Sequence, residues 1–242
     1  MRYLINFSYD GSKFHGFQRQ NKLKTVQGEI EKALANLAQS EVSIHASGRT
    51  DKGVHAKNQY AHFDLDKDIK PYNLKKYLNS NFNEEIYIKS VENVSNSFHA
   101  RYNVKDKTYS YYINMDEFNP IEKDYVYQLC KKIDINEMKK ASKCLIGEHD
   151  FRSFATDSND KENTIREIYS ITFENVNNQL KVTFVGNGFL RKMVRNIMGI
   201  LIEIGLNKKK GSYLKDILDS KKRIGNLKCA PPEGLYLEKV SF

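Results

Sequence analysis

The chain has 242 residues, 40% of them hydrophobic and 12% aromatic, a composition that supports a globular core and excludes an intrinsically disordered chain. The net charge of +9 favours a polyanionic partner such as nucleic acid, although a well-solvated basic surface would give the same charge. No apolar run is long enough to cross a bilayer and no signal-peptide pattern opens the chain, so we expect a cytoplasmic protein that makes no membrane contact. Three cysteines without CxxC spacing, Cys130, Cys144 and Cys229, indicate free thiols rather than disulfides or a zinc site.

The first half of the chain predicts six elements in the order βαββαβ. Apolar residues that alternate or form short runs predict strands over 3–9, 42–47, 54–64 and 86–94. Helical spacing predicts a helix over 26–39, capped by Thr25, and another over 71–81, opened by Pro71.

The second half repeats this order with a different sequence. Strands are expected over 107–115, 165–174, 180–185 and 235–240, and helices over 135–146, 189–204 and 213–218. The dipeptide Asn177-Asn178 predicts a tight turn between the two middle strands. Two split βαβ units in succession predict an α+β fold, an α/β sandwich of two ferredoxin-like halves. We expect these halves, 1–103 and 104–242, to share a largely antiparallel sheet with helices on one side.

The segment 47–55, Ser-Gly-Arg-Thr-Asp-Lys-Gly-Val-His, concentrates polar chemistry between two predicted strands. Its glycines permit close backbone approach to a ligand, and Arg49 and Lys52 favour the ionised form of Asp51. A polar turn capped by Asp51 explains the same residues. A triad of Ser47, Asp51 and His55 is disfavoured, because hydrolases place such residues on separate elements. The spacing of His45, His55 and His62 matches no common metal site, so no metal is expected.

Motifs over the whole chain match one known family. The most specific is Ala46-Ser-Gly-Arg-Thr-Asp-Lys-Gly-Val-His-Ala56. The others lie at 7–19, 25–31, 98–102, 107–112, 189–199 and 230–237. Together they resemble the TruA family of tRNA pseudouridine synthases.

The resemblance implies an enzyme that isomerises uridine to pseudouridine at positions 38, 39 and 40 of the tRNA anticodon stem-loop. The N1–C1′ bond breaks, the base turns and a C5–C1′ bond forms. This reaction is redox-neutral, so no cofactor is implied. Asp51 is implied as the catalytic nucleophile, with attack on C1′ and proton abstraction to a glycal both left open. The family also implies a homodimer with tRNA as its partner.

Three further residues acquire roles from the resemblance. Arg195 falls at the position that pairs with the catalytic aspartate, and the helix predicted over 189–204 would place Arg191 and Arg195 on one face. Tyr109 corresponds to the active-site tyrosine, whose ring can stack on uracil. Alternation predicts Tyr111 on the same strand face as Tyr109. Arg49 is expected to assist extrusion of the target base from paired RNA.

Other side chains near these motifs are candidates for contacts with RNA. They are Phe17, Gln18, Arg19, Lys52, Lys57, Arg101, Arg152, Arg191 and Lys192. The loops 156–163 and 207–211 read as solvated connections, with a phosphate contact as the alternative for the second. Two competing functions remain open. One is a non-catalytic RNA-binding module, although the chain lacks an RNP1-like run, and the other is a paralogue that modifies different uridines.

Overall fold

The computed structural model describes residues 1–156, 163–222 and 227–242. It divides into two compact units, Met1–Lys105 with Tyr236–Phe242, and Asp106–Leu235. The predicted loop 156–163 lies largely outside the described residues. The domain boundary expected after residue 103 stays a prediction.

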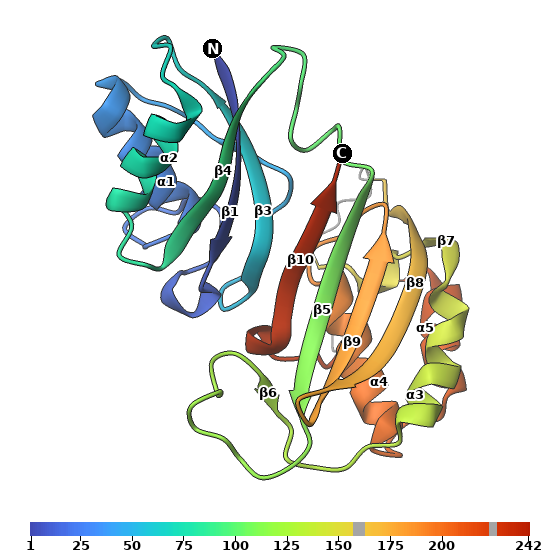
Figure 1. Cartoon of the computed structure of the whole chain (residues 1–242). Helices are drawn as coiled ribbons and strands as arrows, with labels where there is room; N and C mark the ends of the chain where they lie inside the picture. The colour runs from blue at the N-terminus through green and yellow to red at the C-terminus, as the bar shows by residue number, and fades with distance from the viewer. Residues whose placement is uncertain (157–162, 223–226) are drawn as a thin grey trace. The chain divides into compact units, whose positions relative to one another are not determined.

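The first unit has the predicted βαββαβ order (Figure 1). Its elements are β1 (Arg2–Tyr9), α1 (Val26–Ala38), β2 (His45–Ala46), β3 (His55–Asp64), α2 (Pro71–Ser80) and β4 (Ile86–Val94). Strand β1 lies between β4 and β3 and is antiparallel to both, and β2 is antiparallel to β3. The strand β10 (Leu235–Ser241) pairs with β3 in parallel, with Tyr236 opposite His55. The order and direction of β4, β1, β3 and β2 are those of a ferredoxin-like sheet.

Alternation along β1 builds the core of the first unit. Tyr3, Ile5 and Phe7 are 0% exposed, and they share one face of the strand because successive side chains point to opposite faces. Helices α1 and α2 cover one face of this sheet, and Ile30 and Leu74 are also 0% exposed. Alternation in the strand and helical spacing in α1 therefore meet in one apolar layer.

The first turn of α1 is held by groups outside the helix. The Thr25 hydroxyl accepts a hydrogen bond from the Gly28 amide at 3.3 Å. The Val26 and Gln27 amides donate to the carbonyls of Gly16 and Phe17. Residues 10–20 are therefore attached to the start of α1.

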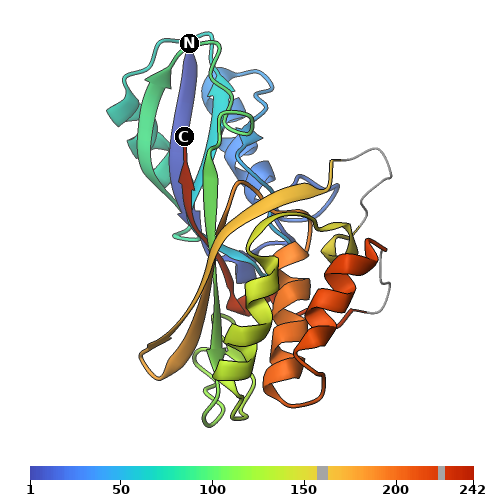
Figure 2. The ribbon, with the colours of Figure 1, turned by 90° about the vertical axis from the view of Figure 1, so that its right-hand side faces the viewer.

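The second unit has a mainly antiparallel sheet in the order β5-β9-β8-β7. Its strands are β5 (Asp106–Asn114), β6 (Tyr127–Gln128), β7 (Gly147–Asp150), β8 (Ile165–Val176) and β9 (Gln179–Gly186). The short β6 is parallel to β5. Helices α3 (Ile135–Ser142), α4 (Met193–Gly205) and α5 (Ser212–Ser220) lie on one face of this sheet (Figure 2). Among the described helices none is long and apolar enough to cross a membrane.

The predicted α+β class is confirmed, and most predicted elements are present. Asn177 and Asn178 have φ values of 49° and 64°, so the β8–β9 hairpin closes through the left-handed turn that the dipeptide predicts. The helix expected over 135–146 ends at Ser142 and continues as a 3₁₀ turn over Lys143–Leu145.

Two further predicted elements differ from the structure at their boundaries. The strand expected over 42–47 is reduced to His45–Ala46, because the Ile44 amide donates to the Glu31 carboxylate instead of to a neighbouring strand. The helix expected from Phe189 begins at Met193, since Lys192 adopts a left-handed φ of 61° that a continuous helix cannot contain.

Candidate active site

The segment 47–54 forms a loop between β2 and β3 in the first unit. Asp51 is half-buried, whereas Arg49 and Lys52 are exposed. The loop turns back at Gly53, where φ is 81° and the Val54 amide donates to the Asp51 carbonyl at 3.2 Å. Asp51 therefore lies at the start of a tight turn with a cation on each side.

A buried hydrogen-bond network holds the loop from the sheet side. The Ser47 hydroxyl donates to Gln59 Oε1 at 2.6 Å, and Gln59 Nε2 donates to the Gly48 carbonyl at 3.0 Å. The hydroxyls of Tyr9 and Thr50 lie 2.8 Å apart. Burial raises the pKa of Tyr9 to about 12, so its hydroxyl keeps its proton at neutral pH.

Residues 10–17 hold the loop from the other side. The Phe17 amide donates to the Thr50 carbonyl at 3.1 Å. Gly16 has a φ of 93°, and a Cβ there would lie 3.2 Å from both the Lys52 nitrogen and the Thr50 oxygen. Only glycine fits this backbone conformation and close approach without strain.

His55 has a structural environment at the end of the loop. Its Nδ1 accepts the Gly11 amide at 3.1 Å, and its ring stacks on Tyr236 at 4.6 Å. A Cβ on Gly11 would lie 2.1 Å from the Val54 carbonyl oxygen, so glycine is required for this packing. These contacts, with the bond from Ser47 to Gln59, do not support a hydrolase triad.

The predicted RNA contacts in the first unit divide by exposure. Gln18, Arg19, Lys52, Lys57 and Arg101 are exposed. Arg19 lies 3.3 Å from the Glu31 carboxylate, and Lys57 lies 2.9 Å from Glu238. Phe17 is 2% exposed and packs near Phe7 and Tyr9, so its side chain offers RNA almost no surface.

The predicted active-site tyrosine lies on β5 in the second unit. Tyr109 is 8% exposed and meets Phe189 edge to face, with ring centroids 5.3 Å apart. Tyr111 is 0% exposed and donates to the Pro231 carbonyl at 2.7 Å. Burial raises the pKa of Tyr111 well above its usual value, so it is a buried hydrogen-bond donor of the core.

Arg195 lies in the first turns of α4 and is half-buried. Its Nε donates to the Ala230 carbonyl at 2.8 Å, and the Ala230 amide donates to the Arg195 carbonyl at 2.9 Å. A Cβ on Gly199 would lie 1.6 Å from the Lys228 backbone oxygen, so α4 needs glycine where the backbone of Lys228 approaches it. The guanidinium also favours the ionised form of Glu233, whose pKa burial raises.

The expectation that Arg191 and Arg195 share a helix face is wrong, because Arg191 precedes α4. Arg191 is exposed, and its carbonyl accepts the Thr156 amide. Lys192 is half-buried at the position before the helix. Arg152 is half-buried in a 3₁₀ turn, with its guanidinium 3.9 Å from Asp150.

The predicted site residues thus come from both units. Arg49 and Asp51 belong to the first, and Tyr109 and Arg195 to the second. The pairing of Asp51 with Arg195 remains a prediction. Over the described residues, no group of three or more His, Cys, Asp or Glu side chains could hold a metal ion.

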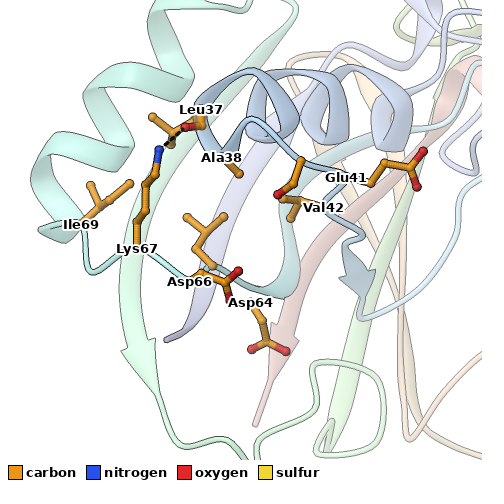
Figure 3. Close-up of a pocket in the computed structure, with 10 residues that line it drawn as sticks. Leu37, Ala38, Glu41, Val42, Asp64, Asp66, Lys67 and Ile69 are labelled. Carbon is orange, nitrogen blue, oxygen red and sulfur yellow. Dashed lines mark hydrogen bonds between the residues drawn. The ribbon is translucent and has the colours of Figure 1, made fainter.

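A hollow of about 170 Å³ lies at the other end of the first unit, beyond the last turn of α1 and the end of β3 (Figure 3). The carboxylates of Glu41, Asp64 and Asp66 line it, and Lys67 donates to the Leu37 carbonyl at 3.2 Å. Because β3 starts at the Asp51 loop and ends here, this hollow is separate from the candidate site. Its carboxylates would repel a polyanion.

The sequence motifs assign no role to the residues that support the loop, Tyr9, Thr50 and Gln59. One signal was present for Gln59. Alternation in β3 places it on the same face as Ala61 and Phe63, which are 0% and 1% exposed. A glutamine at such an inward position needs buried hydrogen-bond partners.

Comparison with known proteins supports the same class of enzyme. A family model described as tRNA pseudouridine synthase matches residues 5–103 and 141–242. The chain is 41% identical to "tRNA pseudouridine synthase A 2" of Bacillus thuringiensis subsp. konkukian, over 99% of both chains. It is also 41% identical to "tRNA pseudouridine synthase A" of Thermosipho melanesiensis, over 100% of this chain and 99% of the relative. In Mycoplasmoides gallisepticum the same name belongs to a relative of 41% identity, over 99% and 90% of the two chains.

The chain therefore belongs to the TruA family of tRNA pseudouridine synthases, an isomerase family that converts uridine to pseudouridine in tRNA.

Proposed function

We propose that this chain modifies uridines 38, 39 and 40 in the anticodon stem-loop of tRNA, with Asp51 as the catalytic carboxylate. The observation that carries the proposal is the Asp51 loop itself. A half-buried carboxylate follows Thr50, which is fixed by hydrogen bonds at both its side chain and its carbonyl. A carboxylate held in this way can meet C1′ or a sugar proton of a bound uridine repeatedly in one geometry.

Each remaining residue of the proposed site supplies one function. Arg195 provides a positive charge that pairs with the Asp51 carboxylate. The Tyr109 ring stacks on the uracil while the base is detached. Arg49, exposed beside Asp51, assists extrusion of the nucleotide from the stem. The two roles open to Asp51, attack on C1′ and proton abstraction to a glycal, both require the ionised form.

The enzyme is proposed to act as a cytoplasmic homodimer that holds tRNA chiefly through phosphates. The candidate contacts that expose side chains in the first unit are Gln18, Arg19, Lys52, Lys57 and Arg101. Arg152, Arg191 and Lys192 are the candidates in the second unit. Phosphate contacts position an RNA without reading its sequence, so the choice of uridine falls to the site around Asp51.

The proposal is tested with tRNA transcripts that carry [5-³H]uridine. Formation of the C5–C1′ bond displaces the hydrogen at C5, so turnover releases tritium. The wild-type chain should release tritium from a transcript with a single labelled uridine at position 38, 39 or 40. Asp51→Asn should lower release by at least about 10³-fold while tRNA binding persists, because the substitution removes the charge and keeps the shape.

Asp68→Asn is the matched control, since it makes the same change at an exposed carboxylate of the same unit. It should retain wild-type turnover. Release by the wild type only from uridines outside the anticodon stem-loop would contradict the proposed positions. Substantial turnover by Asp51→Asn would show that another group performs the chemistry.

A further inference from the structure

The network beneath the Asp51 loop gives two buried side chains a function in the reaction. We infer that Tyr9 and Gln59 are positioning residues, which fix the backbone of residues 47–51 so that Asp51 meets the target uridine in its reactive geometry. The inference rests on the proposed role of Asp51. It concerns side chains that lie under the loop in the core of the first unit.

Gln59 forms hydrogen bonds with the first two residues of the loop. It is 0% exposed, accepts the Ser47 hydroxyl through Oε1 at 2.6 Å and donates through Nε2 to the Gly48 carbonyl at 3.0 Å. These two bonds need an acceptor and a donor on one side chain, which the amide of glutamine provides. A carboxylate at this position could not donate to Gly48, and a hydrocarbon would leave both partners unsatisfied.

Tyr9 fixes the residue directly before Asp51. It is 5% exposed, and its ring lies against Phe14 and Phe17, with centroids 6.5 and 6.3 Å away. Its hydroxyl contacts Thr50 Oγ1 at 2.8 Å, while the Thr50 carbonyl accepts the Phe17 amide at 3.1 Å. Thr50 is thus held through its side chain and its backbone. Because Asp51 is the next residue in the chain, these contacts also restrict its position.

The side chains proposed to bind RNA differ in exposure from the groups that fix the loop. Arg49 and Lys52 are exposed and available to RNA, whereas the atoms that Tyr9 and Gln59 hold point into the unit. Loss of a hydrogen bond from Tyr9 or Gln59 should therefore move Asp51, while Arg49 and Lys52 can still contact RNA. A displacement of about 1 Å at a reacting group can cost on the order of 10²-fold in rate.

The decisive comparison is Tyr9→Phe against Tyr3→Phe. Both tyrosines lie on the same face of β1 and are almost fully buried, at 5% and 0% exposure. The Tyr3 hydroxyl bonds the Ile69 amide and carbonyl at 2.8 and 3.0 Å, at the end of the strand away from the loop. Each variant loses one buried hydroxyl, so both should lose stability, measured by urea unfolding.

Of these two tyrosine variants, only Tyr9→Phe should lower kcat, by about 10- to 100-fold in the tritium assay, with KM and tRNA affinity within about twofold of wild type. Thr50→Val should show the same defect, Thr50→Ser should restore the rate, and the double variant Tyr9→Phe/Thr50→Val should be no worse than either single variant. Gln59→Leu should lower kcat in the same way.

The outcomes separate this inference from the proposed function. If the wild type fails to modify tRNA, or Asp51→Asn remains active, the proposed function is wrong. If the wild type is active and depends on Asp51 but Tyr9→Phe keeps the kcat of Tyr3→Phe, the positioning role is wrong. Additive losses in the double variant would also overturn it, because they would mean that Tyr9 and Thr50 act independently.

Discussion

Arg49 is proposed to assist extrusion of the target nucleotide from an exposed position in the Asp51 loop. It lies between Gly48 and Thr50, whose backbone or side-chain atoms are bonded to the unit beneath, so its own backbone has little freedom. Its side chain is exposed. A restricted backbone that carries a long cationic side chain suits insertion beside a nucleotide, because the backbone loses less conformational entropy when RNA binds.

We predict that the defect of Arg49→Ala depends on the pairing of the target uridine. Extrusion from a stem costs a few kcal/mol and extrusion from a loop less, so turnover should fall about tenfold or more on a paired target and much less on an unpaired one. Single-turnover rates on two transcripts that differ only in pairing provide the measurement.

Arg101→Ala is the control for this prediction, because Arg101 is an exposed arginine of the same unit outside the Asp51 loop. If Arg101 contacts phosphate, Arg101→Ala should weaken the binding of both transcripts equally. Equal defects of Arg49→Ala on the two transcripts would mean that Arg49 is another phosphate contact.

At the scale of elements, helix α1 is closed to an anionic ligand at its first turn. The amides of Val26, Gln27 and Gly28 donate to Gly16, Phe17 and Thr25, respectively. Helix N-termini often bind phosphate through such amides, but here protein groups occupy them. The start of α1 therefore anchors residues 10–20, which in turn contact the Asp51 loop.

Thr25→Ala should lower the free energy of unfolding by about 1 kcal/mol, because it removes the side-chain cap of α1. Thr25→Ser keeps the hydroxyl and should recover most of the loss. Ser40→Ala, which changes an exposed hydroxyl beyond the other end of the helix, should have little effect. Urea unfolding of the three variants is the test, and equal stability of Thr25→Ala and wild type would show that the 3.3 Å bond contributes nothing.

The sequence predicts elements well where local pattern and tertiary contacts agree. Strand β4 has the predicted bounds, Ile86 to Val94, and α1 begins at Val26 after its predicted cap. The pattern fails where a distant side chain bonds a backbone amide or where one residue adopts a left-handed conformation. The Ile44 amide donates to the Glu31 carboxylate, which shortens β2, and the left-handed conformation of Lys192 makes α4 begin at Met193. Neither event has a periodic signature.

The candidate site follows the same division. The motif around Asp51 is recognised in the sequence because it is a contiguous segment. The supporting role of Tyr9 depends on a hydroxyl from a strand distant in sequence that reaches Thr50, and only the fold brings the two together. Motifs identify what the loop carries, and tertiary contacts determine how it is held.

At the scale of the molecule, acid should destabilise the first unit through a cluster of imidazoles. Burial, aided by repulsion from His99, Arg2 and His45, lowers the pKa of His62 to about 4, while Asp64 acts in the opposite direction. His62 is 2% exposed, its Nδ1 accepts the Ala100 amide at 3.1 Å, and its ring is stacked on that of His45. The neutral imidazole fits this site, and the charged one does not.

The sign of the effect follows from proton binding. In the unfolded chain a histidine titrates near 6.5, so between about pH 6.5 and 4 the unfolded state binds more protons than the folded state. Stability is full above that window and should fall as the pH drops through it. The hydrogen bond from Arg2 lowers the pKa of Asp64, so protonation of Asp64 at lower pH should reduce the free energy of unfolding further.

Urea midpoints measured from pH 7.5 to 4.5 test this prediction. His62→Asn keeps an acceptor for the Ala100 amide but cannot titrate in this range. Its midpoint should therefore vary less between pH 6.5 and 4.5 than that of the wild type. Parallel pH dependence in the two proteins would show that His62 does not contribute.

The place of β10 has a consequence for how the protein is made. Tyr236 and Leu237 pair with the start of β3, and His55 at the end of the Asp51 loop stacks on Tyr236. The unit that contains the N-terminal residues therefore lacks one strand until 236–242 have emerged from the ribosome. All of Asp106–Leu235 must be synthesised first. During that interval the start of β3 lacks its β10 partner, while β2 pairs only with Ala61 and His62 farther along the strand, so this unpaired stretch is a template for association with other strands.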